Sequence, residues 1–140
     1  MIEGIGRAAR PRAARSQLRG PPIEGKDKAI LCARIADEAK AKDIIILDLR
    51  GISEVTDYFV ICTATNPRQL RALHSRIREE LKKLAILPLG EDGAESTQWV
   101  LLDYNDVIVH IFHDEFRDFY DLELLWGDAP RIEWQAVEKA

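Results

Sequence analysis

The chain has 140 residues, of which 46% are hydrophobic and 31% are charged, and its formal net charge is −4. This length and composition are typical of one soluble globular domain. They exclude a membrane-spanning protein, because no apolar run approaches the roughly 20 residues that cross a bilayer. No stretch near the start has the apolar centre of a secretory signal. We therefore expect a cytoplasmic protein with no membrane partner.

The first 26 residues differ from the rest of the chain. Residues 1–24 contain five arginines and two glutamates, a balance of +3, so the remaining residues carry −7. An acidic body is a poor match for a protein whose main affinity comes from phosphate contacts. Residues 1–26 have no apolar period, and we expect a disordered basic extension there. The predicted domain covers residues 27–128, and residues 129–140 are interpreted as a C-terminal tail.

An amphipathic helix is predicted to start at Asp27, whose side chain is a candidate N-cap. Its apolar stripe, at i, i+4 and i+8, consists of Leu31, Ile35 and Ala39. Two short strands follow, Ile44–Leu47 and Tyr58–Ala64, and both are typical of strands covered on two faces. The two cysteines, Cys32 and Cys62, lie in this helix and in the second strand without CxxC spacing. We expect both to be buried free thiols.

The clearest helix of the sequence begins at Pro67. Asn66 is its expected N-cap, and Gln69 stands at the capping-box position. Steps of three or four residues make one apolar stripe of Leu70, Leu73, Ile77, Leu81 and Leu84. The polar side carries the basic residues Arg68, Arg71, Arg76, Arg78, Lys82 and Lys83. We expect a solvated face, and the alternative is an RNA contact through this Arg68–Lys83 helix or through the N-terminal arginines.

A β-hairpin is predicted between Trp99 and Phe112, after a polar Gly-rich loop. Its two-residue turn is either Tyr104-Asn105 or Asn105-Asp106, because Asn tolerates the positive φ that such turns require. In both registers one face is aliphatic and must be core: Val100, Leu102, Val107, Val109 and Ile111. The opposite face is mixed: Trp99, Leu101, Asp103, Ile108, His110 and Phe112. In the first register Trp99 lies directly across from His110.

This mixed face is a candidate interaction surface. A charged Asp103 cannot be buried unpaired without a large cost, so we expect its end of the face to be open to water. A final helix follows, with Asp114 as its N-cap and Gly127 at its end. It has too many large apolar residues for one narrow stripe: Phe116, Phe119, Tyr120, Leu122, Leu124, Leu125 and Trp126. Aromatic residues left outside anchor protein interfaces, so we favour a protein-binding surface over plain core.

Candidate catalytic residues are few. His110 and His113 point to opposite faces of a strand, and no further His or paired Cys supplies a third ligand, so we expect no metal. Asp48 ends a buried strand, but Arg50, two residues on, would repel a cation. We interpret these two residues and Asp57, a candidate partner for Arg50, as a structural ion-pair cluster. We expect no catalytic residue and no cofactor.

The predicted order α-β-β-α-β-β-α implies an α/β domain with a mixed sheet of about four strands flanked by helices. Over residues 27–127 the chain resembles the ribosomal silencing factor family, also called Iojap-like. The matching segments, in the family's order and spacing, are DIIILDLRG, TDYFVICTAT, LPLGEDG, WVLLDYNDVIVHIF and RDFYDLELLW. Asn105 replaces a glycine that is common in the family's turn, and it keeps the turn chemistry. The resemblance implies a nucleotidyltransferase-like core without the catalytic carboxylates.

The resemblance also implies a function. A member of this family is not an enzyme; it binds the large ribosomal subunit through large-subunit ribosomal protein fourteen, blocks joining with the small subunit and represses translation when nutrients are short. The expected partner-binding residues are Trp99, Asp103, Tyr104, His110, Arg117, Tyr120, Leu125 and Trp126. A bacterial cytoplasmic location is favoured over an organellar one. The alternative functions are large-subunit assembly and a degenerate nucleotidyltransferase-like enzyme, and the further partners considered are ribosomal RNA and a second copy of the chain.

Overall fold

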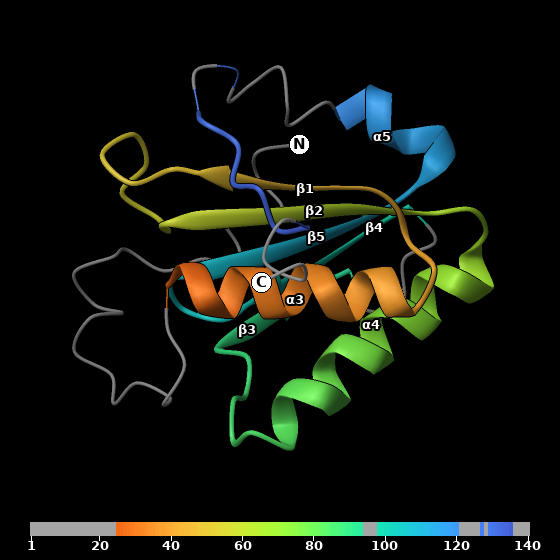
Figure 1. Cartoon of the computed structure of the whole chain (residues 1–140). Helices are drawn as coiled ribbons and strands as arrows, with labels where there is room; N and C mark the ends of the chain where they lie inside the picture. Colours follow the sequence, from red (N-terminus) through yellow and green to blue (C-terminus); the bar gives the residue numbers. More distant parts are fainter. Residues whose placement is uncertain (1–24, 94–97, 121–126, 128, 136–140) are drawn as a thin grey trace.

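Five strands form one mixed sheet in the computed structural model of the chain, which describes residues 25–93, 98–120, 127 and 129–135 (Figure 1). The strands are β1 Lys42–Asp48, β2 Tyr58–Ala64, β3 Gly90–Asp92, β4 Trp99–Asp103 and β5 Val107–His113, in the order β1-β2-β5-β4-β3. The helices are α3 Lys26–Glu38, α4 Pro67–Lys82 and α5 Asp114–Tyr120. The predicted α/β class and the mixed, helix-flanked sheet are confirmed.

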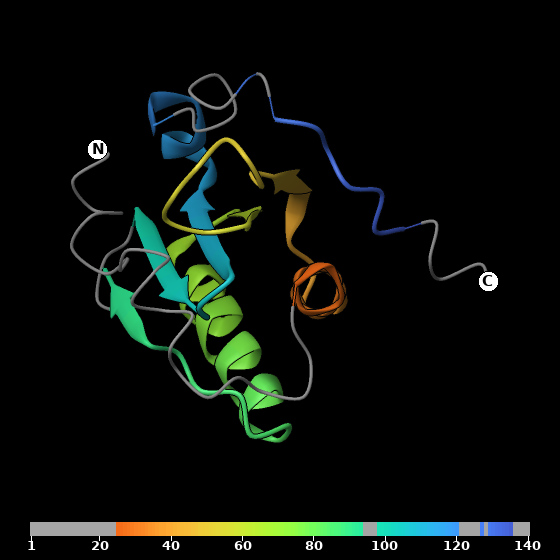
Figure 2. The same ribbon diagram turned by 90° about the vertical axis from the view of Figure 1, so that its left-hand side faces the viewer.

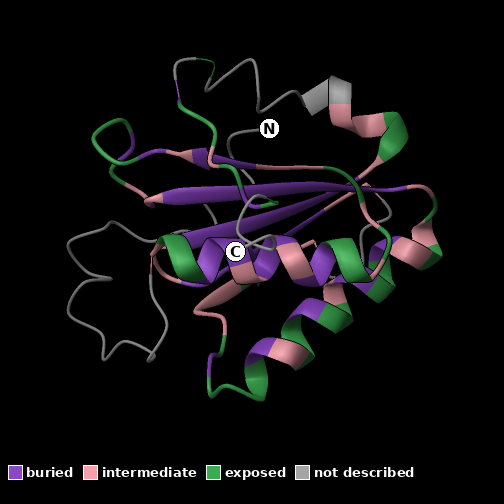
Figure 3. Ribbon diagram, in the orientation of Figure 1, coloured by how far each residue is buried: buried purple, intermediate pink, exposed green. Residues whose placement is uncertain are grey.

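The parallel pair of β2 and β5 forms the centre of the sheet. Tyr58 lies beside Val107 at one end of this pair, and Ala64 lies beside His113 at the other. The other neighbouring strands are antiparallel. All of β2 and nearly all of β5 are buried, and Figure 3 shows both as the buried middle of the domain. Two covered faces explain why the β2 sequence does not alternate between apolar and polar residues.

Helices α3 and α4 cover one face of the sheet, and α5 lies on the other side (Figure 2). Helix α4 starts as predicted, with the Gln69 backbone N–H donating to the Asn66 side chain at 2.8 Å. Its buried stripe consists of Leu70, Leu73, Ile77 and Leu81. The prediction that Leu84 continues this stripe is wrong, because the helix ends at Lys82 and Leu84 is 42% exposed.

Helix α3 begins earlier than the sequence suggested. Gly25, with a φ of 64°, stands at its N-cap position, so Asp27 lies within the first turn and is not the cap. Its buried side is made mostly of small residues, while Leu31 is only partly buried. Cys32 and Cys62 are buried free thiols as predicted, and burial raises the pKa of each to about 12. Neither thiol is therefore ionised near neutral pH.

Strand β3 was not predicted. Its three residues pair with β4, with Gly90 beside Asp103 and Asp92 beside Leu101. A strand this short and acidic has no apolar alternation, so its sequence is that of a polar loop. Short, charged edge strands are common because they discourage pairing with other chains. The sheet thus has five strands where about four were expected.

A second apolar cluster covers the sheet face opposite α3 and α4. It consists of Leu47, Leu49, Phe59, Ile61, Leu101, Ile108, Phe112 and Ala129. The loop between β1 and β2 arches over this face (Figure 2). Val55 of that loop and Trp99 of β4 pack against the cluster while staying partly exposed.

Residues 129–135, which lie within the predicted C-terminal tail 129–140, run along the outer edge of β1. The Asp48 backbone N–H donates to the Pro130 carbonyl at 2.8 Å, and the Ile132 N–H donates to the Ile46 carbonyl at 2.9 Å. The Trp134 indole N–H donates to the Ile44 carbonyl at 3.2 Å, and its side chain is buried in the helix-covered core. This segment therefore pairs and covers an edge strand that would otherwise be open.

Replacing Trp134 by alanine tests whether this edge segment belongs to the fold. We expect Trp134→Ala to lower the free energy of unfolding by about 3 kcal/mol, because it removes a large buried side chain. Glu133→Ala, at an exposed neighbouring position, should change it by less than about 0.5 kcal/mol. Urea unfolding followed by circular dichroism measures both. Equal stability of the two variants would show that the segment does not support the sheet.

Candidate protein-binding surface

The β4–β5 hairpin adopts the second of the two predicted registers, with its turn at Asn105-Asp106. Trp99 lies across from Phe112, and His110 lies across from Leu101. Asn105 has a φ of 81°, which is the left-handed conformation that the turn requires. Trp99 and His110 are therefore diagonal neighbours on one face, where large side chains still reach each other.

The two faces of the hairpin have different surroundings. The aliphatic face is core beneath α3 and α4, as predicted. On the mixed face Asp103 and His110 have no exposed surface, while Trp99 is half-buried. The expectation that the Asp103 end is open to water is wrong. The Asp103 carboxylate accepts a hydrogen bond from the Asn105 backbone N–H at 2.9 Å, so the turn itself supplies a partner for the buried acid.

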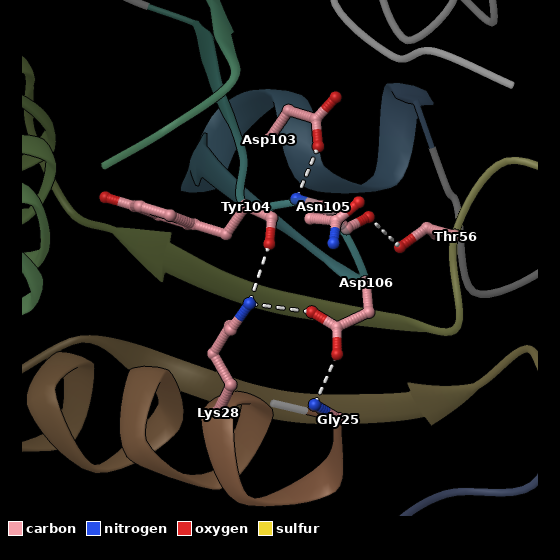
Figure 4. A network of polar contacts seen from close by, with 7 residues as sticks. All are labelled: Gly25, Lys28, Thr56, Asp103, Tyr104, Asn105 and Asp106. Carbon is pink, nitrogen blue, oxygen red and sulfur yellow. Dashed lines mark hydrogen bonds and ion pairs between the residues drawn. The ribbon is translucent and has the colours of Figure 1, made fainter. Parts of the chain in front are cut away.

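A buried lysine holds this turn against the start of α3 (Figure 4). Lys28 has no exposed surface, and its Nζ donates to Asp106 Oδ1 at 2.8 Å and to the Tyr104 carbonyl at 2.9 Å. The Gly25 backbone N–H donates to the second oxygen of the Asp106 carboxylate. A buried charge is stable only when it is paired and hydrogen-bonded, and Lys28 meets both conditions. Nothing in the sequence indicates this burial, because a lysine in an amphipathic helix is expected on the exposed side.

Tyr104 belongs to the same end of the hairpin. Its side chain is 1% exposed and packs in the helix-covered core with Val100 and Leu102. Burial raises the pKa of its hydroxyl. Asp103 lies four positions after Trp99 on β4, which is roughly 14 Å at about 3.4 Å per residue. The predicted site residues therefore divide between two ends of the hairpin, a turn end with Asp103 and Tyr104 and an α5 end with Trp99 and His110.

Aromatic rings gather at the α5 end. The Trp99 ring stacks on Phe112, with centroids 5.1 Å apart and planes at 23°. The Trp99 Nε1–H donates to His110 Nδ1 at 3.1 Å. The edge-to-face pair of His110 and Phe59 has centroids 4.4 Å apart. Three strands thus contribute to one aromatic layer, with Trp99 as its partly exposed member.

His110 is neutral in the folded chain. Its complete burial lowers the pKa of the imidazole from 6.5 to about 3. Nδ1 accepts the Trp99 hydrogen bond, so the ring proton resides on Nε2. Nε2 is buried and has no hydrogen-bond partner among the residues described. A neutral ring with this tautomer is the form that can accept from an indole.

Helix α5 continues the surface from the end of β5. The Arg117 guanidinium donates to the Asp43 carbonyl at 2.8 Å and to the Thr63 hydroxyl, so it ties α5 to the neighbouring strands. Tyr120 is the last residue of α5. Leu125 and Trp126, the other two predicted site residues, lie outside the described part of the chain. Of the predicted set, the structure therefore brings Trp99, His110 and the α5 residues to one end of the sheet.

Asp48, the candidate catalytic carboxylate of the sequence, forms an ion pair with Arg50. Arg50 Nε donates to Asp48 Oδ1 at 2.9 Å, and its Nη2 donates to Oδ2 at 2.7 Å. These hydrogen bonds hold the pKa of the Asp48 carboxyl below its usual value. Arg50 thus pairs with Asp48, and not with the predicted candidate partner Asp57. Within the described residues, no three His, Cys, Asp or Glu are placed to hold a metal, and no helix is long and apolar enough to cross a membrane.

The basic side of α4 is exposed, and several of its charges are neutralised. Arg76 Nη2 lies 3.4 Å from Glu38 Oε1, and Arg78 Nε lies 3.3 Å from Glu91 Oε2. Lys83 Nζ lies 3.1 Å from Glu80 Oε2. Exposed pairs of this kind contribute about 0–1 kcal/mol each to stability. Their main effect is to lower the positive electrostatic potential around α4, because each carboxylate offsets a basic side chain that would otherwise attract a phosphate.

Comparison with known proteins gives consistent matches. The model of the family described as ribosomal silencing factor during starvation matches residues 22–140. A ribosomal silencing factor of Bacillus subtilis is 41% identical over 100 residues, which make up 71% of this chain and 85% of that protein. The chloroplastic protein Iojap of Zea mays is 36% identical over 123 residues, which make up 81% of this chain and 54% of that protein. A crystal structure of a Chromobacterium violaceum protein matches with a TM-score of 0.72 at 34% identity, over 75% of this chain and 88% of that one.

Replacing Lys28 by methionine tests the polar network at the turn. The change keeps the apolar stem but leaves Asp106 without its cation, so we expect the free energy of unfolding to fall by about 3 kcal/mol. Lys26→Met, at an exposed position of the same helix, should change it by less than about 0.5 kcal/mol. Guanidinium unfolding measures both variants. Similar losses in the two would mean that the Lys28–Asp106 pair does not hold the turn.

The low pKa of His110 predicts an acid-dependent loss of stability. The unfolded chain takes up a proton on this ring below about pH 6.5, while the folded chain does so only near pH 3. Stability should therefore fall as pH drops through this window, by about 1.4 kcal/mol per pH unit at most. His110→Asn lacks the titrating ring and keeps an acceptor for Trp99. The free energy of unfolding is measured at pH 7 and at pH 4.5. Between these two values it should fall by about 2–3 kcal/mol less in the variant than in the wild type. Equal falls in the two proteins would contradict the low pKa of His110.

Proposed function

The chain belongs to the ribosomal silencing factor family, and we propose that it binds the large ribosomal subunit through large-subunit ribosomal protein fourteen. We propose that this contact blocks joining with the small subunit and represses translation when nutrients are short, in a bacterial cytoplasm. Family membership carries the proposal, because the matching relatives are named as ribosomal silencing factors. Assembly of the large subunit is the alternative use of the same contact.

The α5 end of the mixed face is the surface that we assign to this partner. Trp99 is partly exposed there, and Phe112 and His110 contact its ring from the protein side. A rigid, partly exposed tryptophan has the properties of an interface hot spot. Arg117 ties α5, which follows β5, to Asp43 and Thr63, and we propose that Tyr120, Leu125 and Trp126 complete the contact. The surface offers aromatic area together with the exposed acids Asp114 and Glu115 of α5, and negative charge suits a protein partner better than a phosphate backbone.

The buried members of the predicted set act behind this surface. Asp103, Tyr104 and His110 have at most 1% of their surface exposed, which leaves no area for a direct contact. Asp103 and Tyr104 belong to the turn end, where they shape the hairpin. His110 supports Trp99 directly. We therefore propose that these three residues hold the binding surface in place.

The enzymatic alternative has less support. A nucleotidyltransferase would need a free carboxylate at Asp48 to hold a divalent ion together with further acids. Both Asp48 oxygens already accept hydrogen bonds from Arg50. The relatives are named for regulation of the ribosome, and that role needs no chemistry at this position.

Replacing Trp99 by alanine tests the proposed function. Wild-type protein should sediment with isolated large subunits and stay unbound with small subunits. Trp99→Ala should weaken binding to isolated ribosomal protein fourteen about thirtyfold, because hot-spot aromatics contribute roughly 2–4 kcal/mol and 1.4 kcal/mol corresponds to one decade. Calorimetric titration measures the affinity, and the unfolding midpoint shows whether the variant stays folded.

Arg71→Ala is the matched control. Arg71 is exposed on α4, which covers the opposite face of the sheet from α5, so this variant should bind like the wild type. If Arg71→Ala instead weakened binding to whole large subunits in a salt-sensitive way, while Trp99→Ala bound them like the wild type, the contact would lie on the basic helix and on ribosomal RNA. Sedimentation with the small subunit would reject the proposal as a whole.

A further inference from the structure

The side chain of Trp99 has a single polar atom. The indole Nε1–H is a donor only and accepts nothing. At protein interfaces, exposed tryptophans commonly use this N–H to bind the partner or water. Here it is already used within the chain, because Nε1 donates to His110 Nδ1 at 3.1 Å. The part of the ring that stays accessible is therefore carbon.

A histidine is an unusual choice for the position that supplies this acceptor. The cluster around it is apolar, and includes Phe59, Leu101, Ile108 and Phe112. His110 is fully buried, and its Nε2 has no hydrogen-bond partner among the described residues. A buried donor without a partner costs about 1–3 kcal/mol, so Leu or Phe would suit the layer better. A residue type that is unfavourable for its surroundings often has a functional role. What His110 offers here, and Leu or Phe could not, is the acceptor for the Trp99 N–H.

Two contacts among the described residues orient the Trp99 ring. Stacking on Phe112, at 5.1 Å and 23°, sets the plane of the indole. The hydrogen bond to His110 sets which edge of the indole faces inward. A side chain fixed in this way before binding loses less conformational entropy when a partner arrives.

We propose that His110 is a positioning residue, which takes up the only polar atom of Trp99 so that Trp99 meets its partner through ring carbon alone. The partner group seated on the indole is therefore an apolar side chain and not a hydrogen-bond acceptor. This inference rests on the proposed function, since it describes how the same surface recognises its protein partner. It assigns His110 a role in recognition although His110 touches no partner atom.

Three substitutions of His110 separate positioning from packing. His110→Phe fills the apolar layer but removes the acceptor. His110→Asn keeps an acceptor close to the Nδ1 position. His110→Leu repeats the loss of the acceptor with a different shape, so that a poorly folded phenylalanine variant does not prevent the test. Trp99→Phe identifies the Trp99 indole N–H signal in a nitrogen-15 correlation spectrum, because that signal alone disappears.

The first measurement uses the full chain without a partner. In wild type and His110→Asn, the Trp99 indole N–H should exchange slowly with solvent. In His110→Phe and His110→Leu, its exchange should be at least about tenfold faster, as expected when a hydrogen bond of about 1.4 kcal/mol is lost. Unchanged protection in both acceptor-free variants would overturn the proposal, because the hydrogen bond would not determine the state of the indole.

The second measurement is affinity for isolated ribosomal protein fourteen. His110→Phe and His110→Leu should bind about tenfold more weakly than wild type while remaining folded, and His110→Asn should bind within about threefold. Equal or tighter binding by the acceptor-free variants would overturn the proposal, since the freed N–H would then be harmless or useful to the partner. If wild type itself fails to bind this protein, the proposed function is wrong, and the exchange measurement shows separately whether His110 holds Trp99.

Discussion

Asp106 joins three parts of the chain that lie far apart in sequence. Its carbonyl accepts hydrogen bonds from the Asp57 and Tyr58 amides at 3.1 and 3.0 Å, which places the start of β2 beside β5. Its carboxylate accepts from Gly25 and Lys28 at the start of α3. The hairpin turn, the central parallel pair and the first described helix are therefore held in mutual position by one residue. The cross-strand pairing of the hairpin, in which Trp99 lies across from Phe112 and diagonal to His110, therefore depends on this turn.

The two ends of the mixed face use buried polar groups for different purposes. At the turn end, Asp103 and Lys28 have their partners and no exposed surface, so they contribute to a unique fold. At the α5 end, His110 Nδ1 accepts a hydrogen bond from Trp99, while Nε2 has no hydrogen-bond partner among the described residues. Trp99, the side chain that His110 supports, is partly exposed. A buried polar group with only some of its hydrogen bonds lowers stability. Because His110 lies behind Trp99, its support of the proposed binding residue explains why this loss of stability is tolerated.

The charges of the chain also favour a protein-binding role. Arg50 is paired with Asp48, and Arg76 and Arg78 on α4 lie beside glutamates of other elements. These pairs reduce the field that a nucleic acid would detect. The aromatic layer at the α5 end is then the more distinctive surface, and it belongs to a chain whose described body is acidic. Aromatic area that is rigid before binding is what a specific protein contact requires.

The sequence by itself determined the local features of this protein. The bounds of β2, the cap of α4 at Asn66 and the aliphatic face of the hairpin follow from periods and caps that span a few residues. The tertiary structure decided the hairpin register, the burial of Asp103 and Lys28, and the pairing of residues 129–135 with β1. Lys28 and Asp106 are 78 residues apart, and Trp134 and Ile44 are 90 apart. No local pattern encodes such partners, because whether a charge or an edge is satisfied depends on which distant segment the fold brings beside it.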